Sequence, residues 1–209
     1  MINCALCGSE TQKFTEIQER IYYQCFNCHG ISLDPSFYLT NKQEKERYEI
    51  HNNDVTDSGY QNFVSPIVNA IAKNYTPHHK GLDFGSGTGP VITTMLRKQG
   101  YDITTYDPFF DPNPNALRQT YNYIACCEVM EHFHNPNKEF ALLHSLLEEN
   151  GTLYCKTYLY NSSINFNSWW YKNDPTHVFF YTEKTLQWIQ SKFNFSKLII
   201  SDKLICFRR

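Results

Sequence analysis

Apolar positions recur at helical spacing between residues 60 and 75. Phe63, Ile67 and Ile71 follow one another at intervals of four residues, so they share one face of a helix. The polar pair Asp57-Ser58 supplies a cap for the start of this helix. The pattern predicts an amphipathic helix whose apolar face packs on a main domain.

A strand, a helix and a second strand are predicted in succession after this helix. The strands cover Lys80–Phe84 and Tyr101–Tyr106, and the helix between them starts at Pro90 and closes at Gly100. A crossover through a helix joins parallel strands, so this unit predicts an α/β fold with a mostly parallel sheet.

A further helix and strand are predicted towards the C-terminus. The helix starts at Pro136, after the capping residue Asn135, and ends at Asn150-Gly151. Its buried stripe is Phe140, Leu143 and Leu147. Thr152–Tyr158 is the next predicted strand, and Cys126-Cys127 are expected to be inert packing thiols in a buried strand before the helix.

The segment between Asp107 and Tyr123 breaks this succession. It contains Pro108, Pro112 and Pro114, and proline disrupts a regular helix. We therefore expect a shortened connection here, and a third strand that is stunted or absent.

Four cysteines near the N-terminus form two C-x2-C pairs, Cys4 with Cys7 and Cys25 with Cys28. Each pair can aim two thiolates at one ion, and four thiolates suit tetrahedral zinc. The strand-like run Arg20–Gln24 between the pairs predicts a zinc ribbon. Four cysteines leave no open coordination position, so we expect a structural or recognition role for zinc rather than a catalytic one.

Three parts of the chain are predicted from these patterns. A zinc ribbon covers residues 1–35, and a main domain covers residues 55–209. Residues 36–54 between them include the charged, helix-favouring run 41–50, which predicts a solvated linker helix.

Composition narrows the class of protein. The 209 residues carry a formal charge of −2 and have a pI of 6.4, which gives no general attraction to nucleic acid or anionic lipid. The N-terminus lacks the features of a signal peptide, and no run reaches the roughly 18–20 apolar residues of a membrane span. Eight cysteines without a secretion signal favour a reducing compartment. We expect a cytoplasmic protein with no membrane partner, and the sequence indicates no oligomeric state.

A glycine-rich loop follows the strand that ends at Phe84. Gly85, Gly87 and Gly89 alternate in it, and Asp107 ends the next predicted strand. Glycine lets a backbone turn sharply and approach a ligand closely, and an acid after the second strand can hold the hydroxyls of a ribose. The combination predicts a cofactor that contains a nucleoside.

Three stretches carry a resemblance to a known family. The run from Asp83 to Gly89, D-x-G-x-G-x-G, resembles motif I of the class I S-adenosylmethionine-dependent methyltransferases. Glu128-Val-Met-Glu-His132 is similar to the E-V-L-E-H ending of their fourth strand and following turn. Trp170–Leu186 resembles the D-P-T-H-V segment of a bacterial subgroup that also has an N-terminal zinc ribbon. The resemblance covers about residues 45–209.

This resemblance implies a Rossmann-like fold with a mostly parallel sheet and a C-terminal antiparallel hairpin. The shortened third-strand region is a departure of this chain from the family pattern. It also implies a binding site for S-adenosylmethionine, whose amino group Asp83 would meet directly or through water. The implied cofactor-binding residues are Asp83, Phe84, Gly85, Ser86, Gly87, Gly89, Asp107, Pro108, Glu128 and Val129. Because the usual third-strand acid is missing, Phe109 or Phe110 is expected to pack on the adenine ring.

The acceptor end of the site is expected to contain histidine and aromatic residues. Methyl transfer at a sulfonium depends mainly on alignment, and a base is needed only if the acceptor must lose a proton early. His132 and His177 are the catalytic candidates, because histidine titrates near neutral pH. Trp170, Tyr171 and His177 are the candidates for contact with the acceptor. Purely structural roles are the alternative for all of them. The domain is short, with no room for a large separate lid, so we expect the roof of the site to come from residues 41–60 and from the 160–180 loop.

The function that fits best is methyl transfer from S-adenosylmethionine to a small-molecule acceptor. One alternative is an RNA methyltransferase that grips RNA with the ribbon, although Lys13 and Arg20 are the ribbon's only basic residues. A binding protein with an inactive methyltransferase fold is another. A nicotinamide-dependent enzyme is disfavoured, because its fingerprint is G-x-G-x-x-G rather than the alternating glycines found here.

Overall fold

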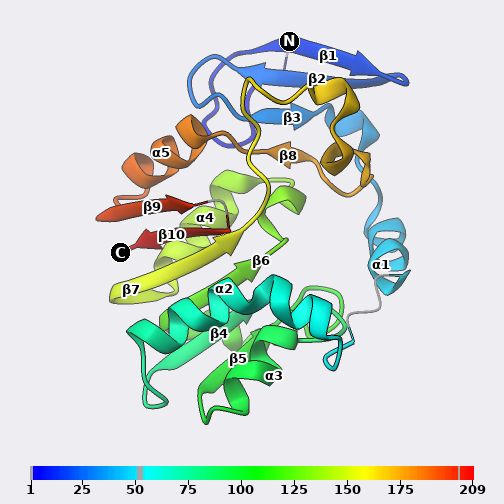
Figure 1. Cartoon of the computed structure of the whole chain (residues 1–209). Coiled ribbons are helices and arrows are strands. Elements are labelled where there is room, and N and C mark those ends of the chain that lie inside the picture. The colour runs from blue at the N-terminus through cyan, green and yellow to red at the C-terminus, as the bar shows by residue number, and fades with distance from the viewer. Residues whose placement is uncertain (1, 51–53, 202) are drawn as a thin grey trace.

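The structure is a computed structural model that describes residues 2–50, 54–201 and 203–209. Its strands form a small sheet and a large sheet, which lie one above the other in Figure 1. The large sheet contains, in spatial order, β5 (Asp102–Tyr106), β4 (Lys80–Phe84), β6 (Tyr121–Cys127), β7 (Leu147–Lys156), β10 (Leu204–Arg208) and β9 (Lys197–Ser201). The small sheet contains β1 (Thr11–Ile17), β2 (Arg20–Cys25), β3 (Ile31–Leu33) and β8 (Phe179–Phe180).

The large sheet confirms the predicted Rossmann-like arrangement. Strand β4 pairs in parallel with both β5 and β6, and β6 pairs in parallel with β7. Strand β10 is antiparallel to β7 and to β9, so the two last strands form the expected C-terminal hairpin.

Helices cover both faces of the large sheet. The helices are α2 (Ser58–Asn74), α3 (Val91–Arg97), α4 (Pro136–Ser145) and α5 (Glu183–Lys192). Side chains alternate between the faces of a strand. In β6, Tyr123 and Ala125 accordingly pack with α2 and α3, whereas Ile124 and Cys126 pack with α4 and α5. A strand buried on both faces is typical of a parallel sheet.

The connection from β5 to β6 is short, as its prolines predict. Residues 108–120 are all described, and they form only the 3-10 helix η2 (Ala116–Arg118) and a bridge between Asp107 and Asp111. The large sheet therefore begins at β5, and the third strand expected of the family is absent from the described residues.

Most of the predicted helix boundaries are confirmed, with one clear error. Oδ1 of Asp57 caps α2 by accepting hydrogen bonds from the N–H groups of Gly59 and Tyr60. The prediction that the helix after Pro136 runs to Asn150-Gly151 was wrong, because α4 ends at Ser145 and β7 begins at Leu147. Leu147 is buried as predicted, but it pairs with Tyr121 in the sheet.

The small sheet joins segments from distant parts of the sequence. Strands β1, β2 and β3 form an antiparallel meander, and β8 adds to the edge of β3 through Ile31–Phe180 and Ser32–Phe179. The side chains of Tyr22, Phe166 and Phe180 are buried beside it in one aromatic cluster. The N-terminal residues are thus packed on the 166–180 segment, and Figure 1 shows the two segments side by side.

Candidate active site

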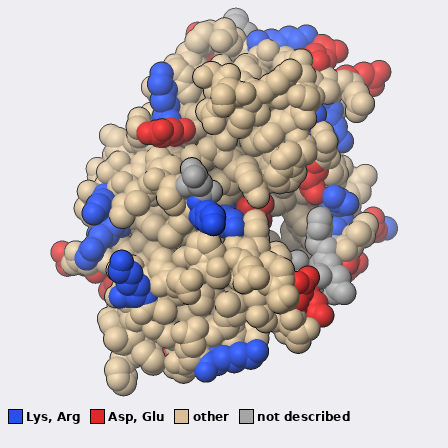
Figure 2. Space-filling model, viewed as in Figure 1, with Lys and Arg blue, Asp and Glu red and all other residues tan. Residues whose placement is uncertain are grey.

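A pocket of about 1170 Å³ opens at the carboxyl ends of β4, β5 and β6. This edge is where ligands bind in open parallel sheets. All the residues predicted to bind the cofactor or the acceptor line the pocket, so the fold brings them together from separate stretches of the sequence. Figure 2 shows a hollow at this level, between the upper and lower halves of the molecule.

The glycine loop after β4 has a shape that requires glycine. Gly85 has a φ of +77°, and a Cβ atom there would lie 2.5 Å from a methyl carbon of Val129. Gly87 also has a positive φ, of +64°. L-residues rarely adopt this region, so the loop runs close to the 128–129 turn only because side chains are missing.

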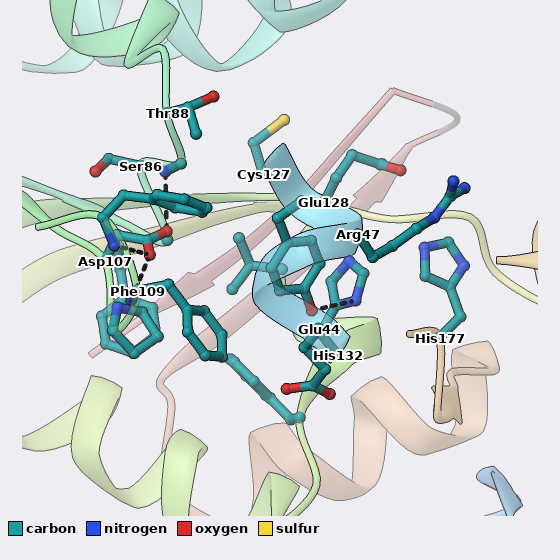
Figure 3. A pocket seen from close by; sticks show the side chains of 18 of the residues that line it. Glu44, Arg47, Ser86, Thr88, Asp107, Phe109, Cys127, Glu128, His132 and His177 are labelled. Atoms are coloured by element: carbon teal, nitrogen blue, oxygen red, sulfur yellow. Dashed lines mark hydrogen bonds between the residues drawn. The ribbon is translucent and has the colours of Figure 1, made fainter. Parts of the chain in front are cut away.

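Asp107 faces this loop from the end of β5. Its Oδ2 accepts a hydrogen bond of 2.9 Å from the Gly87 N–H. Its Oδ1 accepts hydrogen bonds from the N–H groups of Phe109 and Phe110. The carboxylate therefore sets the positions of both loops at one end of the pocket (Figure 3).

Asp83 lies deeper, at the end of β4. It is 4 % exposed, and its Oδ2 accepts a hydrogen bond of 2.7 Å from the hydroxyl of Thr93. Burial raises its pKa from 3.8 to about 6, because the charged form loses hydration. The acid that precedes the glycines is therefore a buried group on the pocket wall.

His132 and His177 lie at the end of the pocket opposite Asp107, and Figure 3 shows their rings beside Arg47. Their ring centroids are 4.8 Å apart at an angle of 73°. Nδ1 of His177 is 2.6 Å from the carbonyl oxygen of Tyr171, and Nδ1 of His132 is 3.0 Å from that of Thr176. The two histidines come from separate turns, and the fold places them face to edge.

Two acidic residues, the buried Glu131 and the half-buried Glu128, lie beside these histidines. The hydroxyl of Tyr171 donates a hydrogen bond of 2.6 Å to Oε1 of Glu131 and lies 3.2 Å from Oε2 of Glu128. Burial, followed by the charge of Glu131, raises the pKa of Glu128 to about 9, and burial raises the pKa of Glu131 to about 7. Among the described residues, Oε1 of Glu128 and Oε2 of Glu131 have no hydrogen-bond partner.

Some aromatic residues of the 158–171 segment line the pocket, and others pack behind it beside the small sheet. Trp170 is 59 % exposed and lines the pocket rim, with its ring 5.0 Å from that of Tyr158. Tyr171 also lines the pocket but is almost fully buried. Trp169 instead packs in the aromatic cluster beside the small sheet. Cys127, expected to be an inert buried thiol, is half-buried and lines the pocket, so this expectation was wrong in part.

The linker helix α1 (Asn41–Ile50) forms part of the pocket wall, as expected for the 41–60 segment of a domain with no room for a separate lid. Sequence reasoning missed the contacts that its side chains make. Glu44 is buried and contacts Nε2 of His134 at 2.8 Å, and Arg47 forms a 2.8 Å ion pair with Asp174. The Tyr48 hydroxyl lies 3.2 Å from Nδ1 of His132. The helix is therefore only partly solvated.

Two signals in the sequence could have indicated the contact of Tyr48 with His132 and the acidic pair beside it. Tyr48 is an aromatic residue in an otherwise charged run, and Glu131 is part of the same E-V-M-E-H motif that contains Glu128 and His132. The partners of Glu44 and Arg47 lie 90 and 127 residues further along the chain, so no local sequence pattern can predict these contacts.

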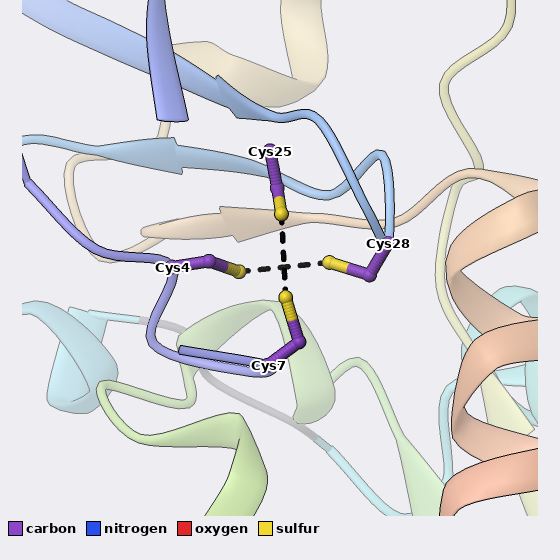
Figure 4. A group of neighbouring side chains, drawn as sticks. All are labelled: Cys4, Cys7, Cys25 and Cys28. Carbon is purple, nitrogen blue, oxygen red and sulfur yellow. Dashed lines mark hydrogen bonds between the residues drawn. The ribbon is translucent and has the colours of Figure 1, made fainter. Parts of the chain in front are cut away.

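The four N-terminal cysteines converge on one point, as predicted from their spacing. Their sulfur atoms all lie within 4.8 Å of one another, with Cys4–Cys28 at 3.5 Å and Cys7–Cys25 at 3.3 Å. Figure 4 shows the four side chains pointing to a common centre. A tetrahedral site with Zn–S bonds of about 2.3 Å has sulfurs about 3.8 Å apart, so the donor set fits zinc.

The comparison with protein families decides the identity of the fold. A family model described as a methyltransferase domain matches residues 56–199. The chain belongs to this methyltransferase family. It is a class I S-adenosylmethionine-dependent methyltransferase. The search of curated proteins found no match.

Solved structures of other methyltransferases share the fold at low sequence identity. The 1,6-didemethyltoxoflavin-N1-methyltransferase of Burkholderia thailandensis, with S-adenosylhomocysteine bound, is 16 % identical. Its TM-score is 0.57, and the match covers 96 % of this chain and 99 % of that one.

Phosphoethanolamine N-methyltransferase 2 of Haemonchus contortus, in complex with S-adenosylmethionine, is 12 % identical with a TM-score of 0.58. That match covers 82 % of this chain and 48 % of the other. A methyltransferase of Archaeoglobus fulgidus is 14 % identical with a TM-score of 0.54, over 71 % of this chain and 94 % of that one. Within the described part of this methyltransferase, no helix has the length and apolar character needed to span a bilayer.

Proposed function

We propose that this methyltransferase acts on a small polar molecule that lies beside the cofactor in the same pocket. The volume of about 1170 Å³ supports this proposal, since pockets of roughly 300–1,000 Å³ hold a single drug-sized ligand. The pocket therefore has room for a nucleoside cofactor and a small acceptor. Lys and Arg are scattered on the face shown in Figure 2, which offers no basic track for RNA.

The solved neighbours support the same acceptor class. The Burkholderia enzyme, which aligns over nearly its whole length, holds the small molecule 1,6-didemethyltoxoflavin together with S-adenosylhomocysteine. From this neighbour we infer only that the acceptor is a small molecule, and not which molecule it is.

The cofactor end lies between the glycine loop and Asp107. S-adenosylmethionine supplies a methyl group on a sulfonium, and its transfer to an acceptor lone pair leaves the C–S bonding pair on sulfur. Asp107 would bind the ribose hydroxyls, and Asp83 the amino group. Phe109 or Phe110 would pack on adenine. The other proposed contacts are Phe84, Gly85, Ser86, Gly87, Gly89, Pro108, Glu128 and Val129, all of which line the pocket.

The acceptor end lies beneath α1. Trp170 and Tyr171 form one wall, and His132 and His177 are the proposed catalytic residues. Each imidazole has its Nδ1 at a carbonyl oxygen, which fixes the ring and presents Nε2. We propose that these two Nε2 atoms activate the nucleophilic atom of the acceptor.

The N-terminal cysteines serve a structural zinc ion in this proposal. Residues 1–35 form the ribbon, residues 36–54 the linker and residues 55–209 the cofactor-binding domain. The ribbon holds β8 through β3, and Asn137 of α4 donates a hydrogen bond of 2.7 Å to the carbonyl oxygen of Leu6. Because His177 lies two residues before β8, the ribbon would help to position the acceptor end.

Labelled methyl transfer tests the proposed acceptor class. The full chain is incubated with methyl-labelled S-adenosylmethionine and, in separate reactions, with a small-molecule extract and with total RNA. We expect label in the small-molecule fraction, and loss of this label in an Asp107→Ala variant. Label in RNA at a comparable rate would overturn the acceptor class. Calorimetry with S-adenosylmethionine tests cofactor binding separately.

A further inference from the structure

A second cluster of metal-binding side chains lies at the acceptor end, apart from the four cysteines. Glu131, His132 and His177 each offer one ligand atom, and these atoms lie within 4.8 Å of one another. Nε2 of His132 is 3.9 Å from Oε1 of Glu131. Ligand atoms about 2.0–2.2 Å from one ion are roughly 3–3.6 Å apart from one another. Side-chain rotations that shift each ligand atom by less than about 1 Å would therefore close the site.

Both imidazole rings are oriented as in a metal site. A carbonyl oxygen can only accept a hydrogen bond, so Nδ1 of His132 donates to Thr176 and Nδ1 of His177 donates to Tyr171. The lone pair of each neutral ring is then on Nε2. Histidine ligands of metals usually donate their other ring N–H in this way, which fixes the tautomer and the direction of the ligand atom.

The carboxyl groups beside the histidines also favour a bound cation. Glu131 is fully buried, and its Oε2 has no hydrogen-bond partner among the described residues. Glu128 is half-buried, but its Oε1 is buried without a hydrogen-bond partner among the described residues, and it shares the hydroxyl of Tyr171 with Glu131. Buried carboxylates are costly unless they are paired or coordinate a metal. The nearby Arg47 does not supply this charge, because it forms an ion pair with Asp174.

We propose that Glu131, His132 and His177 bind a divalent transition-metal ion next to the acceptor. Two imidazoles and one carboxylate suit ions such as Zn²⁺, Co²⁺, Ni²⁺ or Fe²⁺, whereas Mg²⁺ and Ca²⁺ prefer oxygen ligands alone. Three protein ligands leave coordination positions open, unlike the four cysteines.

This inference deepens the proposed function and rests on it for the identity of the acceptor end. An ion held there would bind an oxygen atom of the acceptor and lower the pKa of its hydroxyl group. From the proposed ion we infer that the acceptor is a small molecule with a hydroxyl group. With the ion in place, the two Nε2 atoms would activate the acceptor as ligands of the ion, and neither histidine would act as a base.

Titration with Co²⁺ tests the site directly. The full chain is first loaded with one zinc ion per chain, so that the cysteine site is filled, and Co²⁺ binding is then followed by calorimetry and visible absorption. We expect one Co²⁺ per chain, with the weak absorption of nitrogen and oxygen ligands and without the strong thiolate-to-cobalt bands. The zinc content, measured before and after, should remain one per chain. Absence of Co²⁺ binding, or thiolate bands with loss of zinc, would overturn the proposal.

Variants locate the ion. His177→Ala and Glu131→Gln should each weaken Co²⁺ binding at least tenfold, and glutamine can still accept the hydrogen bond from Tyr171. His78→Ala is the matched control, because His78 is exposed and lies in the turn before β4, outside this pocket. Thermal unfolding of each variant shows whether it folds. Unchanged Co²⁺ affinity in either folded pocket variant would exclude the replaced residue as a ligand and overturn the proposed set of three.

A separate measurement distinguishes this inference from the proposed function. S-adenosylmethionine binding is measured with and without Co²⁺. Cofactor binding and methyl transfer at full rate in protein that holds only the ribbon zinc would leave the methyltransferase assignment intact and overturn the proposed role of the second ion. Co²⁺ binding that requires His177 in a protein that methylates only RNA would overturn the acceptor proposal and keep the ion site.

Discussion

Oδ2 of Asp107 accepts a hydrogen bond of 2.9 Å from the backbone N–H of Gly87, so the acid at the end of β5 holds the glycine loop after β4. The same carboxylate fixes the turn at Phe109 and Phe110 through its other oxygen. An acid predicted only as a ribose ligand thus also sets the shape of the loops around the cofactor site. A single side chain couples the two strands that define this end of the pocket.

Replacing Asp107 should therefore weaken cofactor binding. Asp107→Ala removes the proposed ribose ligand and the hydrogen bond to Gly87, so we expect the Kd for S-adenosylmethionine to rise at least tenfold, or about 1.4 kcal/mol. Calorimetry measures the change. Asp102→Ala, an exposed acid on the same strand, is the matched control and should bind normally. Normal binding by folded Asp107→Ala would contradict the proposed role.

Gly85 offers a test of the close approach between the loop and the 128–129 turn. A Cβ atom in Gly85→Ala would lie 2.5 Å from Val129 at a φ of +77°, so both strain and a clash are expected. Positive φ alone costs about 1–2 kcal/mol in an L-residue. We expect S-adenosylmethionine affinity to fall more than tenfold, with partial recovery in Gly85→Ala/Val129→Ala.

Gly100→Ala isolates the backbone strain. Gly100 has a φ of +83°, but a Cβ atom there meets nothing closer than 4.0 Å. This variant should lose stability and keep its affinity for S-adenosylmethionine. Equal losses of affinity in the two alanine variants would show that the clash with Val129 has no effect.

Asp83 makes the unfolding free energy depend on pH. The pKa of Asp83 is about 6 in the folded state and 3.8 ordinarily, because burial disfavours the charged form. The folded state is therefore more stable at low pH, where the group is protonated in both the folded and the unfolded chain, than at high pH, where it is charged in both. As pH rises from about 4 to about 6, the unfolded chain loses the proton first and the stabilisation disappears. A shift of about two units corresponds to roughly 3 kcal/mol.

Asp83→Asn lacks this titration but can still accept the hydrogen bond from Thr93. Its unfolding free energy, measured with denaturant at several pH values, should rise relative to the wild-type value by up to about 3 kcal/mol between pH 4 and pH 7. Asp102→Asn changes an exposed position, so its unfolding free energy should depend on pH in the same way as that of the wild type. A constant difference between Asp83→Asn and the wild type would show that burial does not shift the pKa of Asp83.

Loss of the ribbon zinc should affect the acceptor end more than the cofactor end. Cys7→Ser should lower zinc content and the temperature of unfolding, because small metal sites supply much of their own folding free energy. The pairing of β3 with β8 would weaken, and acceptor turnover should fall further than S-adenosylmethionine affinity. Metal analysis, calorimetry and methyl transfer measure these effects. Cys206→Ser, a half-buried cysteine outside the cluster, is the matched control.

Local patterns in the sequence predicted most of the elements. The apolar spacing of α2, the proline at the start of α4 and the glycines after β4 each act within a few residues, so their consequences can be read without the fold. The boundary between α4 and β7 was wrong for the same reason, since Leu147 is buried in either structure and periodicity cannot distinguish the two.

The sequence by itself determined the parallel sheet, the cofactor loop with Asp107 and the four-cysteine site, because short motifs with fixed spacing carry each of them. Only the tertiary structure decided that Arg47 of α1 pairs with Asp174, that β8 extends the small sheet, and that His177 meets His132 beside Glu131. These contacts join residues dozens of positions apart. Their energies depend on which surfaces meet after the chain has collapsed, and no local propensity encodes that choice.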